Sequence, residues 1–221
     1  MAHEFLNYID PTENYSDNIN SIIDPSIAPY PLTMNIWFNT TTTGAGSLSL
    51  CGIGTRGPSS HSIRVNLANG RLQGVTKSET SGTTSIATST GHSSGQWNMT
   101  TYVITSSTAR KIILNSNVSN TTTVSRVLQN LDHWVIGGYY EDENIVPSFE
   151  GKLAEFAIWE GVLSDSEIVS LYRGMKANQI KPELLRVYVP LVRDIIDYSG
   201  VIDQISFPSG ATVTSHPKRY G

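Results

Sequence analysis

The chain has 221 residues, a formal net charge of −4 and only 15% charged side chains, against about 25% in an ordinary soluble domain. Its lysines and arginines are scattered, so the basic stripe of a nucleic-acid-binding protein is missing and we exclude that class. No apolar run is long enough to span a membrane, and the length suits one all-β unit, so we expect a single domain over residues 1–221 without membrane insertion.

The amino terminus lacks the basic stretch followed by an apolar stretch that marks a secretory signal peptide, so we expect no signal peptide. Further along, short apolar and β-branched runs are separated by clusters of Gly, Ser, Thr and Asn, which predicts regularly spaced strands. The single cysteine, Cys51, lies in one such run, where we expect a buried and unreactive thiol. The predicted strands cover residues 34–39, 47–53, 62–68, 71–76, 83–90, 97–106, 110–114 and 133–140.

The clearest of these strands is 62–68, in which apolar residues occupy every second position. Asn69 and Gly70 follow it, and this dipeptide suits a type I′ turn because both central residues of that turn need positive φ. The chain can then return over 71–76, although Gly74 interrupts the alternation there. We therefore predict a β-hairpin.

Residues 152–159 are apolar at both alternating sets of positions, with Glu155 as the exception. This pattern indicates a strand that is covered on both faces, so we expect it at the centre of a sheet. The next segment carries Ser164 and Glu167, whose spacing forms a capping box at the start of a helix. Since Gly174 supplies a stop signal, the sequence predicts a single short helix near 164–173.

The segment 149–172 has the order F-x-G-x-hydrophobic-x-E, then a tryptophan, then L-S-x-x-E-I and a final L-Y. It resembles the carboxy-terminal signature of laminin G-like and pentraxin-like domains. Residues 30–38 and 134–138 are similar to an early and a late strand of the same family. The resemblance implies an all-β fold, a two-sheet antiparallel jelly-roll sandwich of the concanavalin A-like kind.

The tail carries a second resemblance, with V-Y-V-P-L at 187–191, D-Y-S-G at 197–200 and H-P at 216–217. It is similar to the ending of laminin G-like proteins encoded by tailed bacteriophages and related mobile elements. We expect 187–191 to return a strand to the sheet, and the amino-terminal strand to pair beside the tail because domain termini are often close together.

The phage resemblance implies a non-enzymatic virion protein, a capsid decoration, cement or fibre component located in the virion. Its partners would be a capsid or other virion protein and further copies of itself. A homotrimer is the favoured oligomer, because it matches the local three-fold axes of an icosahedral shell.

The alternative is a calcium-assisted carbohydrate-binding, lectin-like module, in which a host surface glycan is the partner. Trp37, Tyr139 and Tyr140 could stack on sugar rings, although aromatic side chains in a sandwich more often pack in the core or at its rim. Calcium is the one cofactor that the sequence suggests. An acidic segment of this kind is more often a solvated loop without an ion. If it does bind calcium, the candidate ligands are Asp142, Glu143 and Asn144.

Catalysis is not expected. Glycosidases of this architecture place two carboxylates on alternating positions of one strand, because one protonates the leaving group while the other attacks or activates water. Here Glu141, Asp142 and Glu143 are adjacent, and adjacent strand residues face opposite ways. The five histidines show no zinc-binding spacing, and neither a G-x-S-x-G elbow nor a P-loop occurs.

Overall fold

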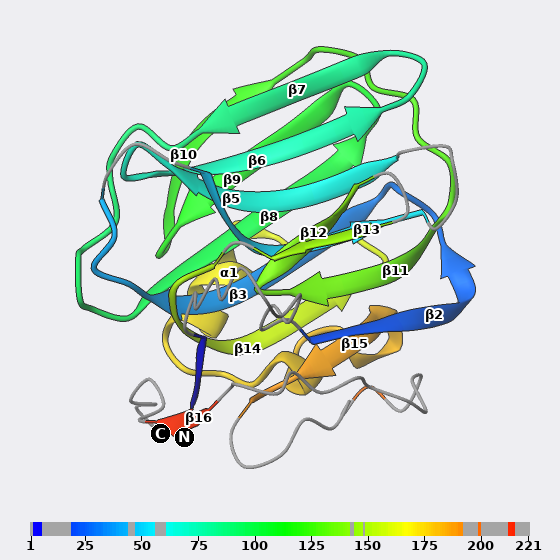
Figure 1. Cartoon of the computed structure of the whole chain (residues 1–221). Helices are drawn as coiled ribbons and strands as arrows, with labels where there is room; N and C mark the ends of the chain where they lie inside the picture. The colour runs from blue at the N-terminus through cyan, green and yellow to red at the C-terminus, as the bar shows by residue number, and fades with distance from the viewer. Residues whose placement is uncertain are drawn as a thin grey trace.

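The computed structural model describes residues 2–5, 19–43, 47–55, 61–141, 144–147, 149–191, 199 and 212–214. These residues form two antiparallel sheets that pack face to face, with one short α-helix on the outside (Figure 1). The predicted all-β sandwich with a single helix is therefore confirmed. No helix of the described part is long and apolar enough to cross a membrane.

The eight-stranded sheet has the order β10-β9-β8-β3-β14-β1-β16, and β15 also pairs with β14. Its strands are β1 (Ala2–Phe5), β3 (Leu32–Asn39), β8 (Asn98–Ser106), β9 (Ala109–Leu114), β10 (Asn117–Thr122), β14 (Gly151–Trp159), β15 (Leu185–Val189) and β16 (Thr212–Thr214). The expected strand after the helix is thus β15. The amino-terminal strand β1 pairs with β16 of the tail, as predicted.

The six-stranded sheet has the order β2-β11-β4-β5-β6-β7. Its strands are β2 (Ile19–Ile27), β4 (Ser47–Gly54), β5 (Ser62–Ala68), β6 (Arg71–Ser78), β7 (Gly82–Ala87) and β11 (Leu131–Ile136). The predicted hairpin is β5–β6, and both of its turn residues, Asn69 and Gly70, have positive φ, which is what a type I′ turn requires.

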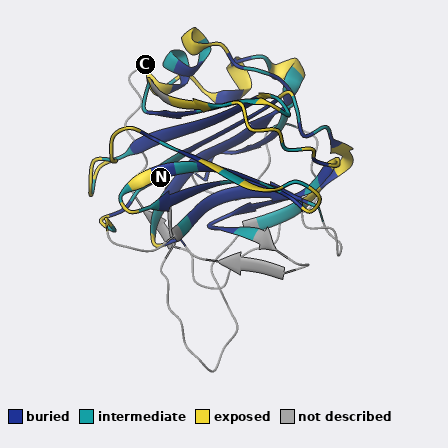
Figure 2. Ribbon diagram, turned by 90° about the horizontal axis from the view of Figure 1, so that it is seen from above, coloured by how far each residue is buried: buried dark blue, intermediate teal, exposed yellow. Residues whose placement is uncertain are grey.

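Alternation along the strands builds the core between the sheets. Every second residue of β5 points inward, as Ile63, Val65 and Leu67 do, and each is at most 2% exposed. Trp134 of β11 lies against Phe156 of β14, with their ring centroids 5.5 Å apart. Figure 2 shows this pattern as two layers of dark-blue buried strands with exposed residues in the connecting turns. Burying this apolar surface is the main source of stability in such a sandwich.

Strand β14 is central, as predicted, since it pairs with β3, β1 and β15. Glu155, the exception in its apolar pattern, lies where the register with β3 shifts between Ala154 and Ala157 and has φ of 56°. Its buried carboxylate accepts a hydrogen bond of 2.7 Å from the hydroxyl of Tyr188 on β15. The polar residue therefore marks a bulge, which turns its side chain toward a hydrogen-bond partner.

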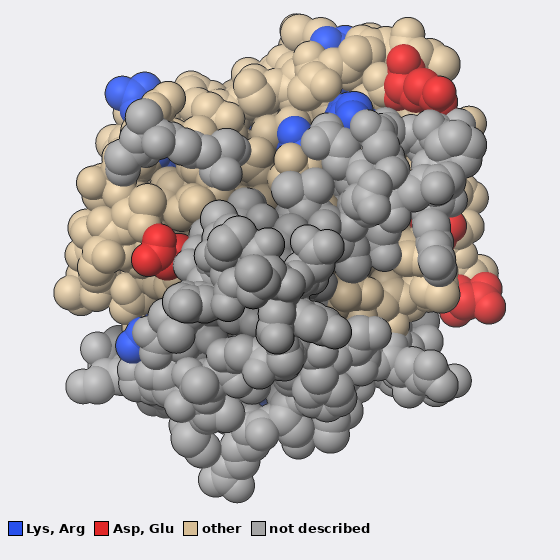
Figure 3. Space-filling model, in the orientation of Figure 1, with Lys and Arg blue, Asp and Glu red and all other residues tan. Residues whose placement is uncertain are grey.

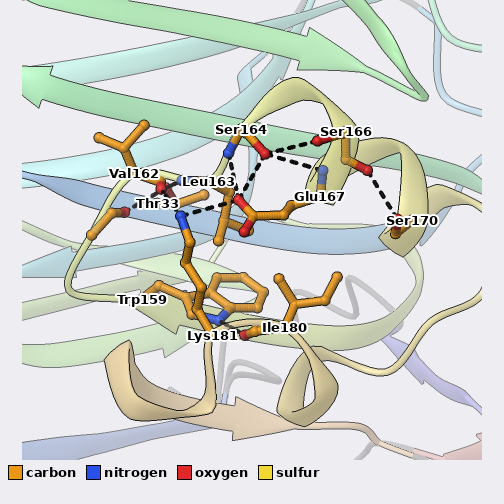
Figure 4. A network of polar contacts seen from close by, with 11 residues as sticks. Thr33, Trp159, Val162, Leu163, Ser164, Ser166, Glu167, Ser170, Ile180 and Lys181 are labelled. Atoms are coloured by element: carbon orange, nitrogen blue, oxygen red, sulfur yellow. Dashed lines mark hydrogen bonds and ion pairs between the residues drawn. The ribbon is translucent and has the colours of Figure 1, made fainter.

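Helix α1 (Asp165–Tyr172) covers the outer face of the eight-stranded sheet, where its Ile168 and Leu171 join a second apolar cluster. The predicted capping box is present, because Ser164 accepts from the backbone of Glu167 while the Glu167 side chain accepts from the backbone of Ser164. Glu167 also forms an ion pair of 3.1 Å with Lys181, in the connection between two 3₁₀ helices, Ala177–Gln179 and Pro182–Leu184 (Figure 4).

Candidate ligand-binding face

A small hairpin lies over the outer face of the six-stranded sheet (Figure 1). It consists of β12 (Gly138–Glu141) and β13 (Asn144–Pro147), and β12 packs against β4 and β5. The predicted single strand 133–140 is wrong at this point. Gly137 has φ of 81°, a conformation that favours glycine, and there the chain leaves β11 and turns onto the outer face.

The outer face beneath this hairpin is polar. On β5 the outward positions are Ser62, Arg64 and Asn66, which alternate with the core residues of that strand. Ser62 and Asn66 are only 2% and 4% exposed, and Arg64 is partly buried. Asn66 accepts a hydrogen bond of 2.9 Å from Ser49 on β4. We call this surface, formed by Ser62, Arg64 and Asn66 with Tyr139 above it, the hairpin face.

Arg64 and Tyr139 are the central contact of the hairpin face. The guanidinium carbon of Arg64 lies 4.0 Å from the centroid of the Tyr139 ring, which is the geometry of a cation–π interaction. Gly52 of β4 lies directly opposite Arg64 in the sheet. A Cβ at Gly52 would lie 3.4 Å from the Cβ atoms of both Arg64 and Tyr139. Both distances are ordinary van der Waals contacts, so Gly52 lies directly beside the Arg64–Tyr139 pair.

Polar atoms of this face are buried without a partner in the described part of the chain. They include Nε and Nη1 of Arg64 and Oγ of Ser62. Buried polar groups are nearly always hydrogen-bonded in folded proteins, so a water molecule or a ligand completes these atoms. His133 adjoins it on β11, next to Gly54, and its Nδ1 lies 2.6 Å from the carboxylate of Asp132.

Charge is spread thinly over this side of the molecule. In Figure 3, which looks onto it, the visible lysine, arginine, aspartate and glutamate side chains are scattered rather than gathered into one patch.

The structure places the predicted aromatic residues on two different faces. Tyr139 belongs to the hairpin face, and Tyr140 follows it in β12, although its side chain lies outside the described residues. Trp37 lies on the opposite side of the sandwich, where its ring stacks on Tyr172 of α1 with a centroid distance of 5.8 Å and an interplanar angle of 3°. Trp37 and Tyr139 therefore cannot contact one sugar together.

In the sequence, the predicted calcium ligands fall between the end of β12 and the start of β13. Asn144 begins β13, but its side chain lies outside the described part, as do Asp142 and Glu143 altogether. Among the residues that the structure describes, no group of three or more His, Cys, Asp or Glu side chains could hold a metal ion. The calcium hypothesis thus stays a prediction.

The sequence analysis did not single out Arg64 and Ser62. The sequence does indicate that both residues face away from the core, because the strict alternation of 62–68 places them two positions apart on the outward side of the strand. The partner Tyr139 lies 75 positions further along the chain. No local pattern could pair them, because the contact depends on how the chain turns at Gly137.

Comparisons with known proteins agree with this fold. Residues 14–169 match the family described as the concanavalin A-like lectin/glucanases superfamily. No curated protein sequence matches the chain significantly. Among solved structures, the chain is similar to a heptameric pentraxin from Limulus polyphemus, with 13% identity, a TM-score of 0.66, and coverage of 96% of this chain and 93% of that one.

Two further similar structures carry sugars. The first is the CBM40 of a Ruminococcus gnavus sialidase bound to α2,3 sialyllactose, with 16% identity, a TM-score of 0.54, and coverage of 70% of this chain and 93% of that one. The second is the ligand-binding domain of botulinum neurotoxin serotype D in complex with N-acetylneuraminic acid, with 12% identity, a TM-score of 0.53, and coverage of 77% and 45%. At these identities the likeness establishes the fold alone.

Proposed function

Since the chain belongs to the concanavalin A-like lectin/glucanase superfamily, we propose that it is a lectin-like protein that binds carbohydrate at the hairpin face and acts by binding rather than by catalysis. The observation that supports this most directly is Tyr139, which is held over a row of outward polar residues on β5. Sugar sites combine an aromatic platform with a few fixed hydrogen-bonding groups, and both are present here.

The opposite face is less suited to a ligand. There Trp37 is stacked on Tyr172, and helix α1 covers the outer apolar cluster of the eight-stranded sheet. Tyr172 itself is 38% exposed. This aromatic residue, far from the hairpin face, offers a matched control for any variant of Tyr139.

The test is a glycan array probed with the purified chain, once with calcium and once with a chelator. We expect binding that Tyr139→Ala lowers at least tenfold and that Tyr172→Ala leaves within about twofold. Loss of binding in chelator would support a calcium ion at the turn that holds Asp142 and Glu143. No binding under either condition, or equal loss with both variants, would contradict the proposal.

Sialylated glycans belong in the array, because the names of two similar structures give sialyllactose and N-acetylneuraminic acid as the ligands of those proteins. Neutral galactose-, glucose- and mannose-terminated glycans complete it. Binding to any one class would support the carbohydrate-binding function.

Assembly on a phage capsid is the second candidate function. It rests on the tail motifs at 187–191, 197–200 and 216–217, and nothing in the named comparisons points to a bacteriophage. Light scattering coupled to size exclusion tests it. A trimer that persists in chelator, and that attaches to phage capsids assembled without this protein, would support a virion role. A monomer that attaches to no such capsid would contradict one.

A further inference from the structure

The guanidinium of Arg64 is a cation without an acidic partner in the described part of the chain. Two of its nitrogens, Nε and Nη1, are buried and donate no hydrogen bond to any described residue. The guanidinium carbon lies over the Tyr139 ring, 4.0 Å from the ring centroid. An aromatic ring stabilises the charge, but it leaves the in-plane N–H groups unused.

This arrangement is costly unless a ligand completes it. Arginine stays protonated at every physiological pH, so the charge cannot be removed by loss of a proton. Burying donors of a charged group without partners is unfavourable. Some other cations of the described part do have acids: Arg186 pairs with Glu160 at 2.6 Å, and Lys111 with Asp165 at 2.6 Å. Arg110 and Arg126 have no acidic partner among the described residues either, but both donate to backbone carbonyl oxygens. Arg64 has neither kind of acceptor in the described part, which favours an anion supplied by a ligand.

The neighbours of Arg64 indicate the kind of anion. Ser62 lies two residues earlier on the same face of β5, and its buried Oγ has no partner among the described residues. Directly opposite Arg64 on the two neighbouring strands lie Gly52 and Val75, neither of which carries charge, whereas Lys77 of β6 lies opposite Ser62. A guanidinium with a hydroxyl beside it matches a singly charged carboxylate on a hydroxyl-bearing ring, because two N–H groups in one plane fit the two carboxylate oxygens.

We propose that Arg64, held under the Tyr139 ring, recognises the carboxylate of an acidic sugar, and that the Ser62 hydroxyl binds the sugar beside it. The inference rests on the proposed carbohydrate-binding function and narrows its ligand to sialic or uronic acids. Arg64 remains partly exposed, so the carboxylate meets the solvent-facing part of the side chain first. Nε and Nη1 of Arg64 and Oγ of Ser62 are buried, so contact with them requires the Tyr139 hairpin to shift on the sheet.

The ligand side of the test uses pairs of sugars that differ only in charge. Isothermal titration calorimetry compares the α-methyl glycoside of N-acetylneuraminic acid with its methyl ester, and methyl β-D-glucuronide with methyl β-D-glucoside. We expect one acid to bind at least tenfold more tightly than its neutral counterpart, by an amount that shrinks as salt rises, because salt screens the attraction. Equal affinity within both pairs, or tighter binding of glucose 6-phosphate than of either acid, would overturn the proposal.

The protein side uses Arg64→Gln and Arg64→Lys, with Arg71→Gln as control because Arg71 is an exposed arginine at the start of β6. Arg64→Gln should lose at least tenfold in affinity for the acid and leave the neutral sugar unchanged. Arg64→Lys keeps the charge but not the planar fork, so we expect a smaller loss. Circular dichroism and thermal unfolding establish that each variant is folded. If Arg64→Gln does not fold, Arg64→Lys is used for the comparison.

The two proposals fail in different ways. Binding that depends on Tyr139 but not on the ligand carboxylate or on Arg64 would overturn this inference and leave the carbohydrate-binding function in place. No binding of any acidic or neutral sugar, on the array or in solution, would overturn both.

Discussion

Tyr102 of the eight-stranded sheet reaches across the core to Gly74 of the six-stranded sheet. A Cβ placed on Gly74 would lie only 2.5 Å from Cε2 of Tyr102, so the ring rests directly on the glycine backbone. Beyond it, the Tyr102 hydroxyl lies 2.8 Å from Oγ1 of Thr76, two residues further along β6. One side chain thus joins the two layers by packing and by a buried hydrogen bond.

Gly74→Ala should destabilise the protein by about 1–3 kcal/mol, because the added methyl group overlaps the Tyr102 ring in a closely packed core. Gly52→Ala is the matched control, since its new Cβ would meet only ordinary contacts of 3.4 Å. Urea unfolding followed by tryptophan fluorescence measures both. If Gly74→Ala lost no more stability than Gly52→Ala, the tight contact would be absent.

The Tyr102 hydroxyl predicts how stability changes at high pH. Burial raises the pKa of Tyr102 from 10.0 to about 12, partly offset by its hydrogen bond with Thr76 and by the charge of Arg110. Since the folded pKa lies above the unfolded one, the stabilisation is fully present below pH 10 and is lost as the pH rises toward 12.

We expect the wild type to lose on the order of 1 kcal/mol between pH 8 and pH 11 relative to Tyr102→Phe, which has no titrating group at this position. At neutral pH the same variant should cost about 1–3 kcal/mol, because Thr76 loses its buried partner. Parallel urea curves at pH 8, 10 and 11 measure both effects. Identical pH dependence in the two proteins would contradict the prediction.

Much of the fold could be predicted where local pattern and packing agree. The β5–β6 hairpin, the central strand β14 and the capped helix α1 each follow from alternation or capping signals within about ten residues. Gly74 shows the limit. In the sequence it only interrupts a strand, whereas in the structure it is required by Tyr102, 28 positions away.

The hairpin face could be predicted only in part. Tyr139 was predicted as a candidate contact. The predicted strand 133–140 continued straight through Gly137, whose positive φ in fact turns the chain and places the Tyr139 ring over Arg64. Strands β2 and β10 were also missed. In β2 the apolar run is interrupted by Asp24-Pro25, and proline is disfavoured inside a strand. The Asn-, Ser- and Thr-rich sequence of β10 resembles a loop.

The start of helix α1 predicts a loss of stability in acid. Partial burial raises the pKa of Glu167, but hydrogen bonds from the backbone and side chain of Ser164 and the contact with Lys181 outweigh it, so the pKa lies below its ordinary value of 4.5. A carboxylate with a lowered folded pKa stabilises the protein above pH 4.5, and that contribution disappears as the pH falls through the folded value.

Glu167→Gln should therefore be less stable than the wild type at pH 6, with a difference that shrinks toward pH 3. Glutamine can still cap the helix at this position, so the variant removes mainly the charge. Ser164→Ala, which removes the cap itself, should cost about 1 kcal/mol at pH 6. Glu183→Gln, at an exposed site in the second 3₁₀ helix, is the control. A difference in the free energy of unfolding between Glu167→Gln and wild type that stays constant from pH 6 to pH 3 would contradict the lowered pKa of Glu167.

Cys51 offers a chemical probe of the whole sandwich. Its side chain is fully buried in the core, and this burial raises the pKa of the thiol far above its ordinary value, so neither access nor ionisation favours reaction in the folded protein.

At pH 8, labelling of Cys51 by a thiol reagent should follow transient unfolding. The rate should rise about tenfold for each 1.4 kcal/mol of stability lost, when refolding outpaces labelling. Gly74→Ala should thus label about 5- to 150-fold faster than the wild type, and Gly52→Ala at close to the wild-type rate. Labelling of the native wild type as fast as the urea-unfolded chain would show that Cys51 is open to solvent and that the core around it is not closed.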